Sequence, residues 1–265
     1  MVFGFLRKQA ACWSQSHINR NLVIGIDVMQ LNQALKDYLE STVSSTNVGA
    51  RPFFQALRSG AISKQQFLKT QIEFSHMVAF FNRPMAMVVA NIPDAQKRMA
   101  IVANLWEEHG QGVPEKVHGK TILTLIERLG GNVDTIKDDS YTTNIKIFNS
   151  SLSSIAASEN YQFSTAVFGG IERIFVEVST EICDAIVKNN WLPLDRVTHY
   201  VLHKEIDIQH AEDFLKVANN DWGTPEHQKS IKDGIKFGIE LFLNVYSGFY
   251  NDIQSIPRQL QHQCH

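Results

Sequence analysis

The sequence contains little cysteine, and the three cysteines that it has lie far apart. Cys12, Cys183 and Cys264 are odd in number, and none of them belongs to a CxxC pair. A disulfide framework needs paired cysteines, and a zinc ribbon needs closely spaced ones. The sequence therefore argues against both scaffolds and in favour of a fold that is stabilised by its hydrophobic core. A chain of 265 residues, 44% of them hydrophobic, is long enough to bury such a core.

An excess of charge of one sign is also missing. The chain has 25 lysine and arginine residues against 27 aspartate and glutamate residues, and the basic residues are scattered along it. Proteins that bind nucleic acid or an anionic membrane surface usually carry a concentrated basic patch. We therefore expect neither nucleic acid nor a membrane among the partners of this protein.

No apolar run reaches the length of about 20 residues that a membrane-spanning helix needs. The N-terminal segment MVFGFLRKQAACWS has one short apolar patch before Arg7 and Lys8, and it lacks the hydrophobic region of a signal peptide. The resulting expectation is a cytoplasmic protein.

The alternation of apolar and polar residues that is typical of strands is nearly absent, whereas helical periodicity extends along most of the chain. This periodicity predicts helices over residues 28–42, 50–59, 63–92, 94–109, 114–129, 143–157, 161–190, 195–218 and 225–254. No internal repeat or long linker interrupts the pattern. We therefore predict a single all-α domain with the core of a helical bundle.

We expect three parts along this chain. Residues 1–45 are predicted to form an N-terminal arm and a first helix packed on the core, residues 46–255 the helical domain, and residues 256–265 a disordered tail. Pro84 falls inside a long predicted helix, where a proline is expected to kink the helix rather than end it.

The most informative motif is His203-Lys-Glu-Ile-Asp207-Ile-Gln-His210. At about 100° per residue, its spacings of four and three place the two imidazoles and the carboxylate within an arc of roughly 60° on a helix. Imidazole nitrogen together with carboxylate oxygen suits iron, zinc or manganese better than calcium or magnesium. Three side chains on one helix cannot complete a metal site, so other helices must supply further ligands. The alternative is a solvated polar face.

The predicted helix 161–190 offers a first partner for this motif. Glu172 lies in the middle of a largely apolar stripe that contains Phe168 and Phe175. A carboxylate in such a stripe is costly unless it is neutralised, paired or bound to a cation. A buried glutamate that pairs with an arginine or caps a helix is the alternative to a metal ligand.

Two further candidates lie on either side of one predicted loop. Glu108 sits at the edge of the apolar face of its helix, and His118 opens an apolar stripe on the next helix. The neighbouring Glu107 turns further outward on the helical wheel. Acidic pairs at helix ends are also common on solvated surfaces, so this segment alone leaves both interpretations open.

Weaker candidates lie on the predicted helix 63–92. Glu73, His76 and Phe80 share it and could contact a substrate or support the metal ligands, as could Phe168 and Phe175. For His76, a hydrogen-bonded position at the edge of the core is the plainer alternative.

The order NLxEE…H, then a mid-helix glutamate, then HxxxDxxH resembles the heme-oxygenase-like diiron oxidase and oxygenase superfamily. That superfamily shares its seven-helix fold with TenA and PqqC and includes the chlamydial death-domain-associating protein. The resemblance covers roughly residues 50–250 and implies a heme-oxygenase-like (TenA/PqqC-like) helical bundle. By motif position, it also implies a set of six metal ligands, namely Glu108, His118, Glu172, His203, Asp207 and His210.

The same resemblance implies a function. We expect a non-heme diiron oxidase or oxygenase that uses two Fe(II) ions and O2 on a small organic substrate, with an amino acid or amine as the favoured class. Glu172, as a bridge between the metals, and Asp207 are the expected catalytic residues. The donor set fits manganese as well as iron, so manganese stays an alternative.

Other functions remain open at this point. TenA-like hydrolases share the fold and use a cysteine and carboxylates without a metal, and Cys183 lies near the face of Glu172. PqqC-like oxidases need no metal either, and a non-catalytic interaction module is a further alternative. Bundles of this type often dimerise, so a homodimer is also open.

Overall fold

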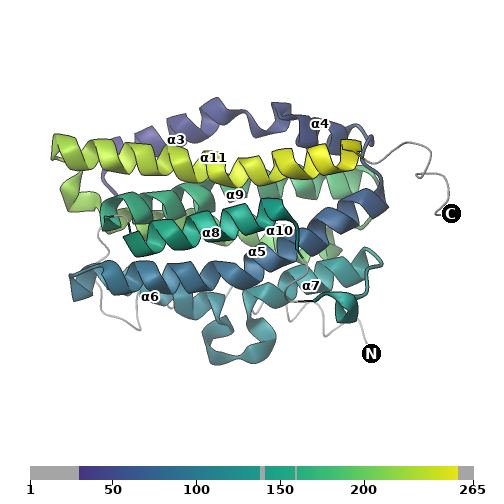
Figure 1. The fold of residues 1–265 in the computed structure, drawn as a ribbon, viewed down its shortest axis with the longest axis horizontal. Coiled ribbons are helices and arrows are strands. Elements are labelled where there is room, and N and C mark those ends of the chain that lie inside the picture. The colour runs from purple at the N-terminus through teal and green to yellow at the C-terminus, as the bar shows by residue number, and fades with distance from the viewer. Residues whose placement is uncertain (1–29, 138–140, 159, 256–265) are drawn as a thin grey trace. The chain divides into compact units, whose positions relative to one another are not determined.

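The computed structural model describes residues 30–137, 141–158 and 160–255, and within these ranges the chain forms nine α-helices and no strand (Figure 1). The helices are α3 (Gln33–Thr46), α4 (Pro52–Arg58), α5 (Lys64–Asn91), α6 (Ala95–Glu108), α7 (His118–Arg128), α8 (Thr143–Ser158), α9 (Tyr161–Lys188), α10 (Thr198–Lys216) and α11 (Pro225–Ser255). The predicted all-α class is therefore confirmed. None of the helices in these ranges is long and apolar enough to cross a membrane.

Polar side chains cap the beginnings of several helices. Ser63 Oγ accepts a hydrogen bond from the backbone N of Gln66 at 3.2 Å, and Gln66 Oε1 accepts one from the backbone N of Ser63 at 2.9 Å. This reciprocal capping box satisfies two backbone donors that would otherwise lack partners. Asp94 and Asn160 cap α6 and α9 in a similar way. These residues explain why the predicted starts of α5, α6 and α9, at residues 63, 94 and 161, agree closely with the observed ones.

One predicted helix is shorter than expected. Periodicity predicted a helix over 114–129, but Pro114–Lys116 forms a separate 3-10 turn and α7 begins only at His118. The reason is Val117, whose extended conformation (φ −59°, ψ 130°) interrupts the helical hydrogen bonding. His118 therefore lies in the first turn of α7 rather than in its interior.

The contacts divide the chain into residues 1–30 and residues 31–265. The second unit contains all nine helices, including α3, which packs on α9 and α11. Residues 1–29, which include most of the predicted N-terminal arm, and the tail predicted for residues 256–265 lie outside the described residues. The domain bounds consequently remain a prediction.

Helix α9 is buried along most of its length, and α10 and α11 pack along it (Figure 1). Small residues allow this close approach. A Cβ atom at Gly170 of α9 would lie 2.7 Å from the carbonyl oxygen of Ile235, and one at Gly238 of α11 would meet the carbonyl oxygen of Val167 even more closely. Backbone thus packs on backbone at both positions, which holds α9 firmly in the core.

We predict that Gly238→Ala lowers the free energy of unfolding by about 1–3 kcal/mol, because the added methyl group must push α11 away from α9. Urea unfolding followed by circular dichroism measures the change. Gly119→Ala in α7 is the matched control, since a Cβ atom there meets nothing within 4 Å. The control should gain about 0.5–1 kcal/mol from helix propensity. Wild-type stability of Gly238→Ala would contradict the close packing.

Candidate metal centre

The three residues of the HxxxDxxH motif share the buried face of α10. His203 Nδ1 donates to Asp207, with distances of 2.9 Å to Oδ1 and 3.1 Å to Oδ2. Because Nδ1 is the donor, the lone pair of a neutral His203 lies on Nε2, which has no hydrogen-bond partner among the described residues. The carboxylate therefore orients the ring and leaves its second nitrogen available, as carboxylates beside metal-bound histidines do.

Glu172 reaches the same place from α9. One ligand atom each from Glu172, Asp207 and His210 lies within 4.8 Å of the others, and all three residues are buried. Burial raises the pKa of Glu172 well above its usual value, and the nearby carboxylates of Asp207, Glu108 and Asp213 raise it further. The carboxyl group of Glu172 thus lies among other acids in a site that is shielded from water.

Glu108 and His118 lie on different helices, but their side chains are in contact. Glu108 is the last residue of α6 and His118 the first of α7, and His118 Nδ1 donates to Glu108 Oε1 at 2.8 Å. The loop between them has three consecutive residues with positive φ, at Gly110, Gln111 and Gly112. Left-handed conformations reverse the chain sharply and favour glycine, which two of these positions have. The loop thereby brings both side chains to one point.

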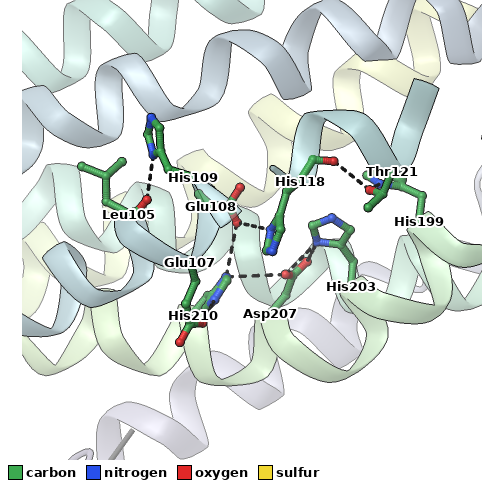
Figure 2. A network of polar contacts seen from close by, with 10 residues as sticks. All are labelled: Leu105, Glu107, Glu108, His109, His118, Thr121, His199, His203, Asp207 and His210. Carbon is green, nitrogen blue, oxygen red and sulfur yellow. Dashed lines mark hydrogen bonds and ion pairs between the residues drawn. The ribbon is translucent and has the colours of Figure 1, made fainter. Parts of the chain in front are cut away.

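The pair from α6 and α7 joins the group on α10, as Figure 2 shows. Glu108 Oε1 lies 3.7 Å from His210 Nδ1, and the ring centroids of His118 and His203 are 5.6 Å apart. All six residues implied by the resemblance therefore gather between four helices.

The pKa values of Glu108 and His118 reflect their contact. Burial alone would raise the pKa of Glu108, but the charge and hydrogen bond of His118, together with His210 and His203, outweigh it and lower the pKa to about 2. Burial alone would lower the pKa of His118, but Glu108, with smaller effects of Asp207 and Glu107, raises it. The two side chains thus form a buried ion pair.

Two residues of the site were missed by the sequence analysis. Glu107 was expected to turn outward, but its Oε2 accepts a hydrogen bond from His210 Nε2 at 3.2 Å. His199 lies one helical turn before His203 and is fully buried, with its ring centroid 4.5 Å from that of His203. Burial, with the neighbouring His203 and His118, lowers its pKa well below the usual value. The extended spacing HxxxHxxxDxxH was the available signal for His199.

The weaker candidates divide into two groups. Phe175 lies against the cluster, with its ring centroid 5.0 Å from that of His203, and Phe168 packs on Phe214 of α10 at 5.2 Å. These rings keep the surroundings of the site apolar.

The candidates on α5 have other contacts. Glu73 Oε2 accepts from the backbone N of Thr142 at 2.8 Å, just before α8. The ring of His76 lies 5.1 Å from that of Tyr141, and Arg83 covers the ring of Phe80. No contact of these three side chains joins them to the six-residue cluster within the described ranges.

The donor atoms fit a cation. His210 donates from Nε2, so the lone pair of its neutral ring lies on Nδ1, which lies 3.7 Å from Glu108 Oε1 and 3.7 Å from Asp207 Oδ1. A lone pair that faces two carboxylates is unfavourable unless positive charge lies between them. Nitrogen and oxygen donors in this mixture suit iron, manganese or zinc.

A family model described as iron-containing redox enzyme matches residues 68–243, which is well over half of the chain and includes all six clustered residues. No curated relative matches the sequence.

Solved structures share the fold at low sequence identity. A TenA homolog from Pseudomonas syringae pv. tomato has 13% identity and a TM-score of 0.65, with 83% of this chain and 92% of that chain covered. A domain of unknown function with a heme oxygenase-like fold from Shewanella denitrificans has 16% identity and a TM-score of 0.64, with 84% and 91% covered. A TenA homologue from P. horikoshii has 12% identity and a TM-score of 0.63, with 84% and 99% covered. These matches show a heme-oxygenase-like fold, as the sequence resemblance implied.

The ion pair of Glu108 and His118 predicts how stability depends on pH when a chelator removes metal ions. Glu108 has a lowered pKa, so its stabilising contribution is present above pH 4.5 and is lost as the pH falls toward about 2. His118 has a raised pKa, so its contribution is complete below pH 6.5 and is lost as the pH rises through the raised value. The pair should be strongest between these limits.

We therefore expect Glu108→Gln to lower the free energy of unfolding most between pH 4.5 and 6.5, by about 2 kcal/mol or more. Urea unfolding at a series of pH values in EDTA gives the difference from wild type. Glu115→Gln, which replaces an exposed acid of the same loop, is the control and should show little change. A difference for Glu108→Gln that is independent of pH would contradict the buried ion pair.

Proposed function

The chain belongs to the family of iron-containing redox enzymes with a heme-oxygenase-like fold, and on this basis we propose that it is a non-heme diiron oxidase or oxygenase. The observation that carries the proposal is the meeting of three carboxylates and three imidazoles from four helices in one buried cluster. Glu108, His118, Glu172, His203, Asp207 and His210 are the proposed ligands.

The number of donors supports a catalytic site rather than a structural one. Six protein ligands shared by two metal ions leave coordination positions for O2 and a substrate, whereas structural sites are usually closed by protein side chains. Two Fe(II) ions bound here would supply the electrons that reduce O2. Manganese would fit the same donors.

The protein contributes geometry and electrostatics to this chemistry. Asp207 and Glu108 hold the rings of His203 and His118 through their Nδ1 atoms, which fixes the direction of the remaining nitrogens. Phe175 packs on the ring of His203 and excludes water from that side. Glu172, whose ionisation is unfavourable beside other buried acids, would be compensated by two divalent cations.

We propose a small organic substrate with a polar group, of which an amino acid or amine is an example. Asn104 supports this class, because it is fully buried on α6, one helical turn before Glu108, and neither atom of its side-chain amide has a hydrogen-bond partner among the described residues. A buried amide without partners costs about 1–3 kcal/mol per group. A bound polar molecule would satisfy both the donor and the acceptor.

Metal-free alternatives have less support. A TenA-like hydrolase needs a reactive cysteine, but Cys183 is buried, and burial raises the pKa of its thiol. A thiol with a raised pKa is a weak nucleophile at neutral pH. A metal-free enzyme of the PqqC type or an interaction module would leave the lone pairs of His203 and His210 without a role.

Asp207→Asn tests the proposal with almost no change in side-chain volume. We expect the wild-type protein to bind two equivalents of Fe(II) under anaerobic conditions and to consume O2 on mixing, with a transient absorption in the visible region. For the variant, the affinity for Fe(II) and the rate of O2 consumption should each fall at least about a hundredfold, because a charged ligand is lost. Helix content should stay close to that of wild type.

Glu205→Gln, on the exposed face of the same helix, is the control for Asp207→Asn and should behave as wild type. Two outcomes would count against the proposal. Wild-type protein that takes up no stoichiometric iron would favour a TenA-like hydrolase, a PqqC-like oxidase or an interaction module. If Asp207→Asn consumes O2 at the wild-type rate, Asp207 and its helix α10 take no part in the reaction.

Glu172→Gln should have opposite effects on stability and on metal binding. The raised pKa means that the folded protein keeps the proton of Glu172 to a higher pH than the unfolded chain, so the wild type loses stability as the pH rises above 4.5. The variant lacks this penalty. In EDTA at pH 8 it should be more stable than wild type by about 1–3 kcal/mol, with a smaller gain at pH 4.

With Fe(II) or Mn(II) present, Glu172→Gln should gain less in melting temperature than wild type does, because it has lost a charged ligand. Glu177→Gln on the same helix is the control, since that carboxylate is near the surface and pairs with Arg173. A variant that is stabilised but binds metal as tightly as wild type would show that Glu172 is a structural residue.

A further inference from the structure

His199 extends the cluster by one helical turn along α10. Its side chain is fully buried, and its ring centroid lies 4.5 Å from that of His203 with an interplanar angle of 62°. Figure 2 shows His199 next to Thr121 of α7, with the ring of His203 between it and the ring of His118. His199 is not one of the six residues that the HxxxDxxH, mid-helix glutamate and NLxEE…H motifs supply.

The hydrogen bonds of Thr121 determine which nitrogen of His199 carries the proton. Thr121 Oγ1 lies 2.7 Å from the carbonyl oxygen of His118 and 2.7 Å from His199 Nδ1. A hydroxyl group has a single hydrogen, and the carbonyl oxygen can only accept it. Thr121 must therefore accept from His199 Nδ1–H. The lone pair of the neutral ring then lies on Nε2.

That lone pair has no partner among the described side chains. His199 Nε2 is buried and makes no hydrogen bond. Aromatic rings surround the imidazole, with centroids of Phe74 at 6.1 Å, Phe175 at 6.0 Å and Tyr200 at 5.0 Å. The hydroxyl group of Tyr200 already donates to Gln71. A buried acceptor in this environment costs about 1–3 kcal/mol unless a ligand satisfies it.

His203 has the same arrangement next to it. Its Nδ1 donates to Asp207, and its Nε2 is likewise buried without a hydrogen-bond partner. Two adjacent imidazoles thus each have one nitrogen held by an acceptor and the other nitrogen free. Two lone pairs cannot satisfy each other, because neither atom has a hydrogen to donate. A cation bound at the cluster would provide the positive charge that such lone pairs lack.

We propose that His199 is a further metal-binding residue, which adds a fourth imidazole to the site through Nε2 while Thr121 holds its Nδ1. This inference rests on the proposed metal centre and deepens it. Donor atoms of Glu172, Asp207 and His210 already lie within 4.8 Å of one another. The imidazoles of His118 and His199 flank that of His203, with ring centroids 5.6 Å and 4.5 Å from it, so His199 would add nitrogen on the side of His203. Nitrogen donors favour Fe(II), Co(II) and Zn(II) over Mn(II), so the two ions would be bound in unequal environments.

The decisive experiment compares His199→Asn with Thr121→Val by anaerobic titration with Fe(II) and with Co(II), followed by calorimetry and by the visible absorption of bound Co(II). An asparagine amide can replace the Nδ1 donor to Thr121 but has no counterpart of Nε2. The valine variant keeps the imidazole and removes only its orienting hydrogen bond. His199→Phe, which keeps an aromatic ring among aromatic neighbours, gives a second test of the lost nitrogen in case His199→Asn folds poorly.

We expect His199→Asn and His199→Phe to bind one of the two equivalents at least about tenfold more weakly than wild type and to change the Co(II) spectrum. The loss should be larger for Fe(II) and Co(II) than for Mn(II), and Thr121→Val should lose less. His227→Asn on α11, which also has an unpartnered buried ring nitrogen, is the control and should bind metal as wild type does.

The outcomes separate this inference from the proposed function. If wild-type protein binds no stoichiometric metal, the proposed function fails and the role of His199 fails with it. If wild type binds two equivalents and His199→Asn or the phenylalanine variant does the same with unchanged affinity, only the role of His199 is overturned. Greater loss in Thr121→Val than in His199→Asn would also overturn it, because the Nδ1 hydrogen bond would then be the feature that matters.

Discussion

The carboxyl groups of Glu108, Glu172 and Asp207 are buried close together between α6, α7, α9 and α10, and this is the main constraint on the structure. Removing a carboxylate from water costs several kcal/mol unless positive charge compensates it. Glu108 obtains that compensation from His118, whereas Glu172 lies beside other acids and has a raised pKa. Close packing of α9 on α11 stabilises the bundle away from the cluster. This packing offsets the cost of burying the Glu172 carboxyl group.

Three of the four imidazoles in and beside the cluster are oriented in the same way, whereas His210 bonds Glu107 through Nε2. In His118, His203 and His199, Nδ1 bonds a neighbouring acceptor, which orients the ring and directs Nε2 to the other side. Phe175 and its aromatic neighbours provide apolar walls. Directed lone pairs beside apolar walls would suit the proposed metal ions, because the walls exclude water.

Part of this cluster could be found from sequence, since three of its proposed ligands occur at a short, regular spacing. His203, Asp207 and His210 fall on one face of any α-helix, and Glu172 interrupts an apolar stripe that can be recognised without coordinates. Glu107 was placed outward because a helical wheel shows no neighbouring helix, but its side chain reaches His210 of α10. Glu73 lies on a candidate helix, yet it bonds the backbone at Thr142.

The sequence alone determined the helical class, the approximate helix ends and the identity of most proposed ligands, because periodicity and capping are local properties of the chain. Only the tertiary structure decided that Glu108 and His118 meet across a loop with three left-handed residues, and that Thr121 orients His199. Those contacts depend on how α6, α7, α9 and α10 pack against one another. Such packing arises from the whole core, so no short segment encodes it.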